Sequence, residues 1–176
     1  MSYHIECKAC ETGRRGFGVV EGRSFTGHYR CDHCDSFGRV KIDHFTLAYI
    51  EAALWSSNDD AGEPLDDANS LDDIASDTLA KMRADCKAFQ DAHGDLFVLA
   101  NCKSASTGSA SEQAGHDFWL TRCGHGAGFW DGDWAEPAAS VLDKAARAFG
   151  NVDLYVGDDG LVYAYPTMPT YRQAPC

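Results

Sequence analysis

Four cysteines in two Cys-x-x-Cys pairs are the residues of this sequence with the clearest chemistry. The pairs are Cys7/Cys10 and Cys31/Cys34, and twenty residues separate them. Four thiolates at this spacing match a tetrahedral zinc site, and four protein ligands leave no coordination position open for a substrate. We therefore predict one zinc ion with a structural role. Iron in a rubredoxin-like site is the alternative metal, and a disulfide framework is a further alternative.

The segment between the two pairs is expected to form the hairpin of a zinc ribbon. Residues 16–30 have the pattern of two short strands around a Gly-rich turn, and Gly13 and Gly38 follow the two pairs. Glycine suits such turns because it adopts positive φ angles without steric cost. A segment this small buries little apolar surface, so metal binding should supply much of its folding free energy. The first predicted domain is therefore a zinc ribbon over residues 1–45.

The second predicted domain, residues 46–176, is an acidic α+β domain with a small antiparallel sheet and about three helices. Apolar residues three and four apart predict helices over 46–55 and up to His93, the latter starting near Ser70 or Ser76. A third helix is expected to begin at Glu136-Pro137, because proline is favoured in a first helical turn.

Glycine-containing turns between apolar runs predict two hairpins in the same domain. The first would pair residues 118–122 with 129–130, and the second would place strands on both sides of the Gly157-Asp-Asp-Gly turn. Residues 101–115 are rich in Ser and Gly, so we expect a flexible loop there. Hairpins in place of strand-helix-strand units favour an antiparallel sheet with helices on one face.

The charge of the chain is strongly negative and unevenly distributed. The formal net charge is −12, yet residues 1–41 carry seven Lys and Arg against five Asp and Glu. Between Lys41 and Lys81 there are ten acidic residues and no Lys or Arg. Such a surface repels nucleic acid and attracts basic protein surfaces. The candidate partner-binding residues are Asp59, Asp60, Glu63, Asp66, Asp67, Asp72 and Asp73. A solvated loop that only aids solubility is the alternative interpretation.

Further short stretches within residues 46–163 are distinctive. They are Leu47-Ala-Tyr-Ile-Glu-Ala-Ala-Leu-Trp, Leu79-Ala-Lys-Met, His116-Asp-Phe-Trp-Leu-Thr-Arg, Gly124-His-Gly-Ala-Gly-Phe-Trp-Asp and Asp153-Leu-Tyr-Val-Gly-Asp-Asp-Gly-Leu. Together they resemble a family of small, acidic, bacteriophage-encoded proteins that has no assigned biochemical function. The resemblance implies a viral accessory protein. Such proteins often modify or block host machinery, including CRISPR effectors, restriction enzymes and RNA polymerase.

One cluster of residues could support catalysis or a second metal site. It consists of His116, Asp117, Arg122, Cys123 and His125. A cysteine close to a histidine is a candidate nucleophile and base, which would make the protein a small hydrolase or transferase. We favour the structural interpretation, a tightly turned hairpin, because no motif places an oxyanion partner. The protein is therefore predicted not to be an enzyme.

The ribbon also offers a second binding mode, direct contact with nucleic acid. Arginines interleaved with aromatic residues can contact phosphates and stack on bases. We favour a core role for the aromatics, because the rest of the chain would repel a polyanion. The arginines are Arg14, Arg15, Arg23, Arg30 and Arg39, and the aromatics are Phe17, Phe25, Tyr29 and Phe37.

The function predicted from these observations is that of a phage-encoded zinc-ribbon interaction protein. It would bind and inhibit a host nucleic-acid-handling or defence protein, such as a CRISPR effector or a restriction enzyme, through its acidic surface. No apolar run approaches the roughly 20 residues that cross a bilayer, so we expect no membrane partner. The first residues lack the charge and apolar pattern of a signal peptide, which places the protein in the cytoplasm of the host cell. A homodimer is compatible with these expectations.

Overall fold

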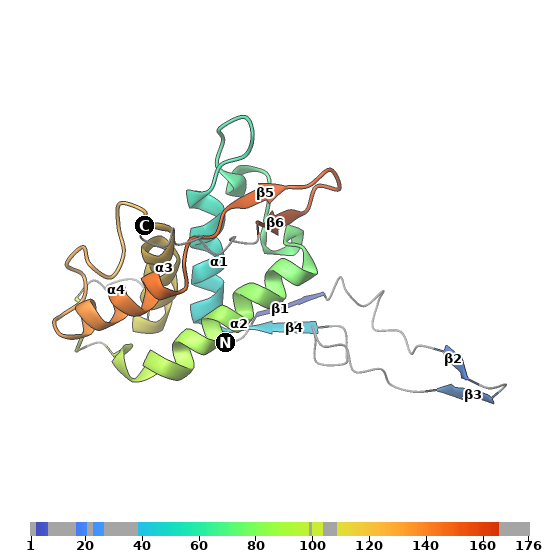
Figure 1. Cartoon of the computed structure of the whole chain (residues 1–176), viewed down its shortest axis with the longest axis horizontal. Helices are drawn as coiled ribbons and strands as arrows, with labels where there is room; N and C mark the ends of the chain where they lie inside the picture. Colours follow the sequence, from blue (N-terminus) through green and yellow to red (C-terminus); the bar gives the residue numbers. More distant parts are fainter. Residues whose placement is uncertain are drawn as a thin grey trace, which may run out of the picture.

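The structure, a computed structural model, describes residues 3–6, 17–20, 23–26, 39–98, 100–103 and 109–165 (Figure 1). Within these residues it contains four α-helices, three two-stranded antiparallel sheets and short 3-10 turns. The predicted α+β class is confirmed. The small antiparallel sheet that was expected is two-stranded, and each described strand pairs within a separate two-stranded unit.

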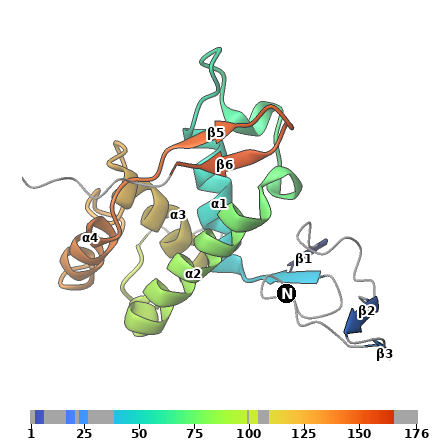
Figure 2. The ribbon, with the colours of Figure 1, turned by 45° about the vertical axis from the view of Figure 1, so that its right-hand side comes forward.

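Helix α1, His44–Ser56, lies in the middle of the helical part of the molecule (Figures 1 and 2). Its first residues are capped by Asp43, whose carboxylate accepts a hydrogen bond from the backbone N–H of Thr46 at 2.7 Å. Sequence patterning placed this helix at 46–55, so the helix is confirmed, and it begins two residues earlier than expected. Buried residues occur on most sides of α1, as expected for a helix surrounded by protein.

Helix α2, Ser76–His93, was also predicted, and its apolar stripe is buried as expected. The stripe consists of Leu79, Met82, Cys86 and Phe89. The Ser70-Leu-Asp-Asp motif does form a capping box with Asp73, but it begins the 3-10 turn η3, Leu71–Asp73, and not the helix itself. A 3-10 turn, η4 at Gly94–Leu96, follows the end of α2.

Helix α3, Ala110–Cys123, overturns one predicted hairpin. Residues 118–122 are helical and residues 129–130 lie in a turn, so neither is a strand. Ser109 and Glu112 form a reciprocal capping box: the Glu112 N–H donates to the Ser109 hydroxyl at 3.1 Å, and the Ser109 N–H donates to the Glu112 carboxylate at 2.7 Å. Gly124 ends the helix at φ 73°, a left-handed conformation that favours glycine. The prediction of a loop over 101–115 is wrong for its last six residues, which belong to α3.

The remaining elements follow the sequence prediction more closely. Helix α4, Ala138–Ala148, begins directly after Pro137. Strands β5, Leu154–Val156, and β6, Val162–Ala164, pair as an antiparallel hairpin. This hairpin is tied to the start of α2, because the Ala75 N–H donates to the Val162 carbonyl at 2.9 Å. With α3 included, the domain has four α-helices where about three were expected.

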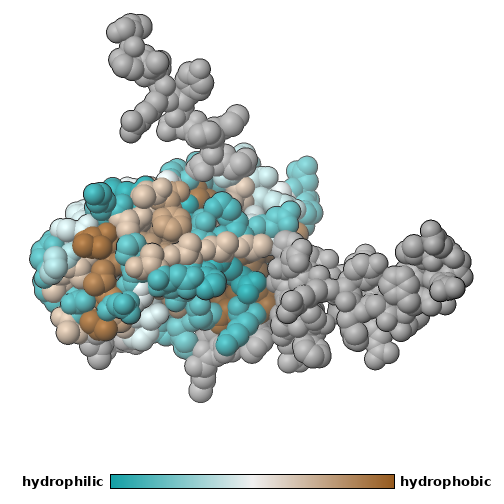
Figure 3. Space-filling model, turned by 60° about the horizontal axis from the view of Figure 1, so that its bottom comes forward, coloured by the Kyte–Doolittle hydropathy of each residue, from teal (hydrophilic) through white to brown (hydrophobic). Residues whose placement is uncertain are grey.

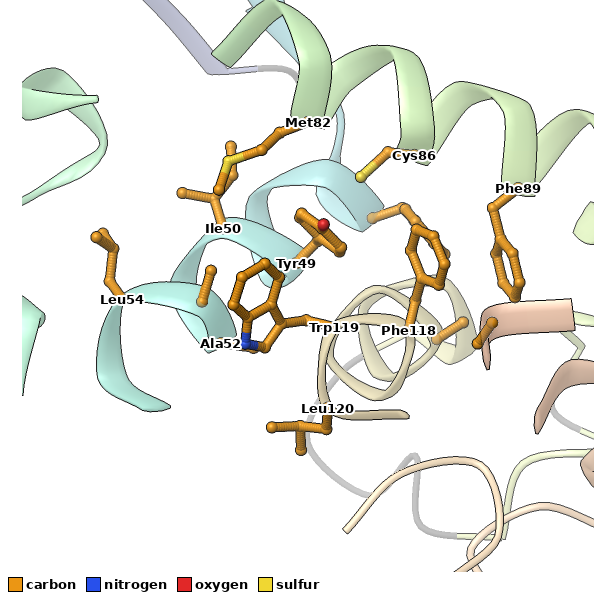
Figure 4. Packing of buried hydrophobic residues seen from close by; sticks show 14 of the residues in the cluster. Tyr49, Ile50, Ala52, Leu54, Met82, Cys86, Phe89, Phe118, Trp119 and Leu120 are labelled. Carbon is orange, nitrogen blue, oxygen red and sulfur yellow. The ribbon is translucent and has the colours of Figure 1, made fainter. Parts of the chain in front are cut away.

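The aromatic side chains of α1, α2 and α3 meet in the centre of the core (Figure 4). Phe89 and Phe118 stack with ring centroids 4.1 Å apart and an interplanar angle of 13°. Tyr49 packs its edge against Trp119, with centroids 5.2 Å apart and planes at 89°. Aromatic pairs of this kind add about 0.5–1.5 kcal/mol beyond the burial of their area. The described core cluster runs from Val40 to Val162 along the chain.

Two short antiparallel pairs precede this helical part. Strand β1, Tyr3–Glu6, pairs with β4, Arg39–Ile42, and β2, Phe17–Val20, pairs with β3, Arg23–Thr26. The second pair confirms the two short strands expected between the cysteine pairs. The first pair places Glu6 opposite Arg39, so the two ends of the intervening chain meet there. Cys7, Cys10, Cys31 and Cys34 lie outside the described residues.

Candidate functional site

The acidic segment, residues 57–75, leaves the end of α1 and returns to the start of α2. Its first part is a closed loop: the Leu65 N–H donates to the Ser57 carbonyl and the Asp59 N–H to the Glu63 carbonyl, both at 2.9 Å. The Asp59 carboxylate accepts two further hydrogen bonds, from the backbone N–H of Ala61 at 2.8 Å and of Glu63 at 3.0 Å. These bonds give the loop one defined backbone path.

Buried side chains fix both halves of the acidic segment to the core. Leu65 is 1% exposed and Ile74 is 2% exposed. Burying an aliphatic side chain of this size contributes about 1.5–3 kcal/mol, enough to keep the loop against the domain. Figure 1 shows the segment projecting from the end of α1 that lies farthest from β4. The segment is therefore an ordered projection and not a loose linker.

The carboxylates of the acidic segment face solvent. Six of the seven candidate residues are exposed, and the seventh, Asp73, is half-buried and accepts hydrogen bonds from the N–H and hydroxyl of Ser70. The exposed six take part in no salt bridge with any other described residue: Asp59, Asp60, Glu63, Asp66, Asp67 and Asp72. The structure thus brings all seven together on one projection, and the six exposed carboxylates face solvent there.

Asp117, one of the residues considered for catalysis, is buried and fully engaged. It is 2% exposed, and its carboxylate accepts hydrogen bonds from the Trp134 indole N–H at 2.7 Å and from the Gln113 amide at 3.0 and 3.1 Å. His116 Nδ1 lies 3.3 Å from the same carboxylate, and its ring stacks on the exposed Trp55. This arrangement joins α3 to the loop around Trp134, which is a structural role.

Arg122, a second member of that cluster, is a buried junction between elements. Its guanidinium donates to the Tyr49 hydroxyl at 2.8 Å and to the Asp85 carboxylate at 2.9 Å. It also donates to two backbone carbonyls, of Gly150 at 2.9 Å and of Phe149 at 3.1 Å. Four acceptors from three places in the chain satisfy one charge, as buried ions require.

Cys123 does not have the environment of an activated nucleophile. Burial raises the pKa of the Cys123 thiol to about 11, and the nearby Arg122 charge only partly offsets this effect. The thiol donates a weak hydrogen bond to the Val152 carbonyl, with sulfur and oxygen 3.7 Å apart. Reactive cysteines have lowered pKa values and open access. The two candidate bases were His116 and His125. His116 lies two helical turns, about 10 Å along α3, from Cys123, and among the described residues the Cys123 thiol is hydrogen-bonded to the Val152 carbonyl and to neither imidazole.

A metal site was also considered for this cluster. Among the described residues no group of three or more His, Cys, Asp or Glu side chains is arranged to hold a metal ion. The four predicted zinc ligands lie outside those residues, so the structure leaves the zinc prediction untested.

A basic pocket that sequence patterning did not predict is lined by residues of β4, of the start of α1 and of α2. Its volume is about 270 Å³, and it is lined by Lys41, Asp43, Thr46, Arg83, Lys87, Gln90 and Asp91. Arg83 and Lys87 are four residues apart on α2, so they share one face of that helix. That spacing is visible in the sequence, but their approach to Lys41 depends on the tertiary fold.

The surface shown in Figure 3 has hydrophilic and hydrophobic side chains interleaved, with small separate apolar areas on this face. None of the helices in the described part of the chain is both long enough and apolar enough to cross a membrane. No protein-family model matches the chain, and comparisons with curated proteins and with solved structures find no match either.

Proposed function

We propose that the protein is a phage-encoded zinc-ribbon interaction protein that binds a basic surface of a host protein through its acidic segment and inhibits that protein. The target would be a nucleic-acid-handling or defence protein, for example a CRISPR effector or a restriction enzyme. Proteins that act on nucleic acids carry the Lys/Arg surfaces that this segment would complement. The phage assignment is supported by the sequence resemblance of residues 46–163.

The observation that carries the proposal is the ordered, solvent-facing array of carboxylates on residues 57–75. Ordering matters because a preorganised surface loses less conformational entropy on binding than a flexible tail does. Unpaired exposed charges matter because they steer a partner of opposite charge over distances comparable with the Debye length, about 8 Å at physiological salt.

The test uses charge-matched pairs of substitutions in the intact protein. Asp66→Asn/Asp67→Asn removes two charges from the acidic segment, and Asp95→Asn/Asp158→Asn removes two exposed charges elsewhere. Each variant is used to capture proteins from nuclease-treated host lysate, and the captured protein is then titrated against the intact chain at several salt concentrations. We expect one stoichiometric basic protein whose affinity falls at least tenfold with the first pair, falls with salt, and changes little with the second pair.

Binding that is indifferent to both salt and the Asp66/Asp67 substitutions would contradict the proposal. Proteins captured from untreated lysate but lost after nuclease treatment would also contradict the proposal, because they would be bound through nucleic acid and not through the acidic segment.

A further inference from the structure

Trp55, near the end of α1, is the one large apolar side chain of that helix that is exposed to solvent. The residue is 46% exposed, whereas Phe45 and Tyr49, the other large aromatic residues of α1, are each 1% exposed. The Trp55 indole lies nearly parallel to the imidazole of His116 on α3, with ring centroids 5.8 Å apart and an interplanar angle of 22°. Nearly half of the residue stays open, so its indole can stack on a second flat group.

Hydrogen bonds on both sides of Trp55 fix its position. The next residue, Ser56, accepts a hydrogen bond from the indole N–H of the buried Trp119 at 2.9 Å, which ties the end of α1 to α3. His116 is held in turn, because its Nδ1 lies 3.3 Å from the carboxylate of the buried Asp117. A surface that is ordered before binding loses less conformational entropy when a partner arrives. The exposed indole is therefore a preorganised contact surface.

The surface beside Trp55 is anionic. The acidic segment begins two residues later, and the hydrogen bond from the Leu65 N–H to the Ser57 carbonyl at 2.9 Å returns the far end of its first loop to the same place. Glu51, one helical turn before Trp55, is also exposed. Neither α1 nor residues 110–121 of α3 contain Lys or Arg. A group that stacks on Trp55 would meet carboxylates there, which favours a group of positive charge.

Arginine fits such a surface better than lysine does. The guanidinium is planar, so it stacks on an indole face while its N–H groups donate to carboxylates. The lysine ammonium is a compact, strongly hydrated charge without a flat face. Trp and Arg are also among the residue types most enriched where a few side chains dominate the binding energy of a protein interface.

We propose that the Trp55–His116 pair is an arginine-binding platform at the base of the acidic segment, so that the basic surface this protein recognises is one that presents arginine. This inference rests on the proposed function, because it names the partner chemistry of the same site. The carboxylates supply attraction and salt dependence, and the indole supplies a preference for arginine over lysine.

The test compares a fluorescently labelled oligoarginine peptide with an oligolysine peptide of equal length. Each is titrated by anisotropy against the intact protein at several salt concentrations. Carboxylates also favour arginine through paired hydrogen bonds, so the decisive quantity is the part of the preference that depends on the indole. The Trp55→Ala substitution should lower the ratio of the oligoarginine to the oligolysine affinity about two- to fivefold, as expected for an exposed cation–π contact.

Three further variants separate stacking from a general loss of packing. Trp130→Ala removes another exposed indole, 51% exposed and outside the Trp55–His116 pair, and should leave the ratio unchanged. Trp55→Leu keeps an apolar side chain and should behave like Trp55→Ala, whereas Trp55→Phe keeps a ring and should retain part of the preference. The far-ultraviolet circular dichroism of Trp55→Leu and Trp55→Phe should match that of the wild type.

Equal ratios for Trp55→Ala and Trp130→Ala, or no preference for oligoarginine in the wild type, would overturn the platform. The double substitution Asp66→Asn/Asp67→Asn distinguishes this inference from the proposed function, because it should weaken both peptides alike and keep the preference. Peptide binding that ignores this double substitution, together with a preference still lost in Trp55→Ala, would contradict the role of the acidic segment and support the platform. Absence of binding to either peptide would overturn both.

Discussion

At the scale of single residues, the cluster around α3 shows how a suggestive set of side chains can be structural. Asp117, Arg122 and Cys123 are close in the sequence, but each points its polar atoms to a different partner. The Asp117 carboxylate accepts a hydrogen bond from the Trp134 indole. The Arg122 guanidinium donates to the Asp85 carboxylate and the Tyr49 hydroxyl. The Cys123 thiol donates to the Val152 carbonyl. Residue types alone could not distinguish this from an active site, because the distinction depends on burial and partners.

Alkaline pH should destabilise the protein partly through Cys123. The ordinary pKa of a cysteine thiol here is 9.0, and burial raises it to about 11 in the folded state. The unfolded chain therefore loses this proton first, so the contribution to stability is complete below pH 9 and is lost as the pH rises to 11. We expect the free energy of unfolding, measured by urea titration, to fall over this range.

The Cys123→Ala variant should show a smaller fall over the same pH range. Burial also raises the pKa of Tyr49 and of Cys86, so part of the fall remains in that variant. Parallel curves of unfolding free energy against pH for wild type and Cys123→Ala would contradict the prediction, because the Cys123 thiol would then have the same pKa in the folded and unfolded states.

At the scale of elements, sequence patterning missed one helix, α3. Its start carries a Ser-x-x-Glu capping signal at Ser109 and Glu112, within a run of Ser, Gly and Ala that resembles a linker. Its second half, Phe118 to Arg122, is rich in aromatic and β-branched residues, which favour strands. Burial against α1 and α2 decided the conformation, and tertiary contacts of that kind are not visible in a local pattern. Helices α1 and α2 were predictable from the regular spacing of their apolar residues, and α4 from the proline before its first turn.

The close approach of α3 to α1 depends on Gly115. A Cβ atom at this position would collide with the backbone carbonyl of Phe45 in the first turn of α1. Backbone cannot move aside as a flexible side chain can, so Gly115→Ala should push the two helices apart. We expect the free energy of unfolding to fall by about 1–3 kcal/mol, the usual cost of overpacking.

Gly126 provides the matched control for that substitution. A Cβ at Gly126 would have no atom within 4 Å, and the residue has no positive φ. Gly126→Ala should change the stability by less than about 0.5 kcal/mol. Equal effects of the two substitutions in urea denaturation would show that the α1–α3 contact tolerates a methyl group.

At the scale of the whole molecule, the core cluster of the described residues runs from Val40 to Val162 and joins α1, α2, α3 and α4 to β4 and to the β5–β6 hairpin. The acidic segment was recognisable from composition alone, whereas its order was not, because the hydrogen bonds of Asp59 and the burial of Leu65 depend on the fold. The basic pocket was likewise beyond sequence analysis, since Lys41 and Arg83 are brought together only by the crossing of β4 and α2.

Metal analysis should find one zinc ion per chain in protein purified without chelator. The Cys31→Ser substitution should lower the zinc content, because three thiolates bind zinc less tightly than four. The double substitution Cys31→Ser/Cys34→Ser should abolish zinc binding. The far-ultraviolet circular dichroism of the variants should keep the signal of α1 to α4, whose described core cluster runs from Val40 to Val162. Cys102→Ser is the control, being a cysteine of the helical domain. Iron in place of zinc would refute the predicted metal, and unchanged zinc content in the double variant would refute the predicted ligand set.

The Arg122 junction also has a consequence for the rates of folding and unfolding. Its hydrogen bonds connect residues 73 and 37 positions away, toward the N-terminus, and residues 27 and 28 positions away in the other direction. Contacts between residues this far apart in sequence form only after long stretches of chain have been closed into loops, so they tend to form late. Removing such a contact accelerates unfolding and leaves the folding rate nearly unchanged. Arg122 would then slow unfolding, and its removal would shorten the lifetime of the native protein.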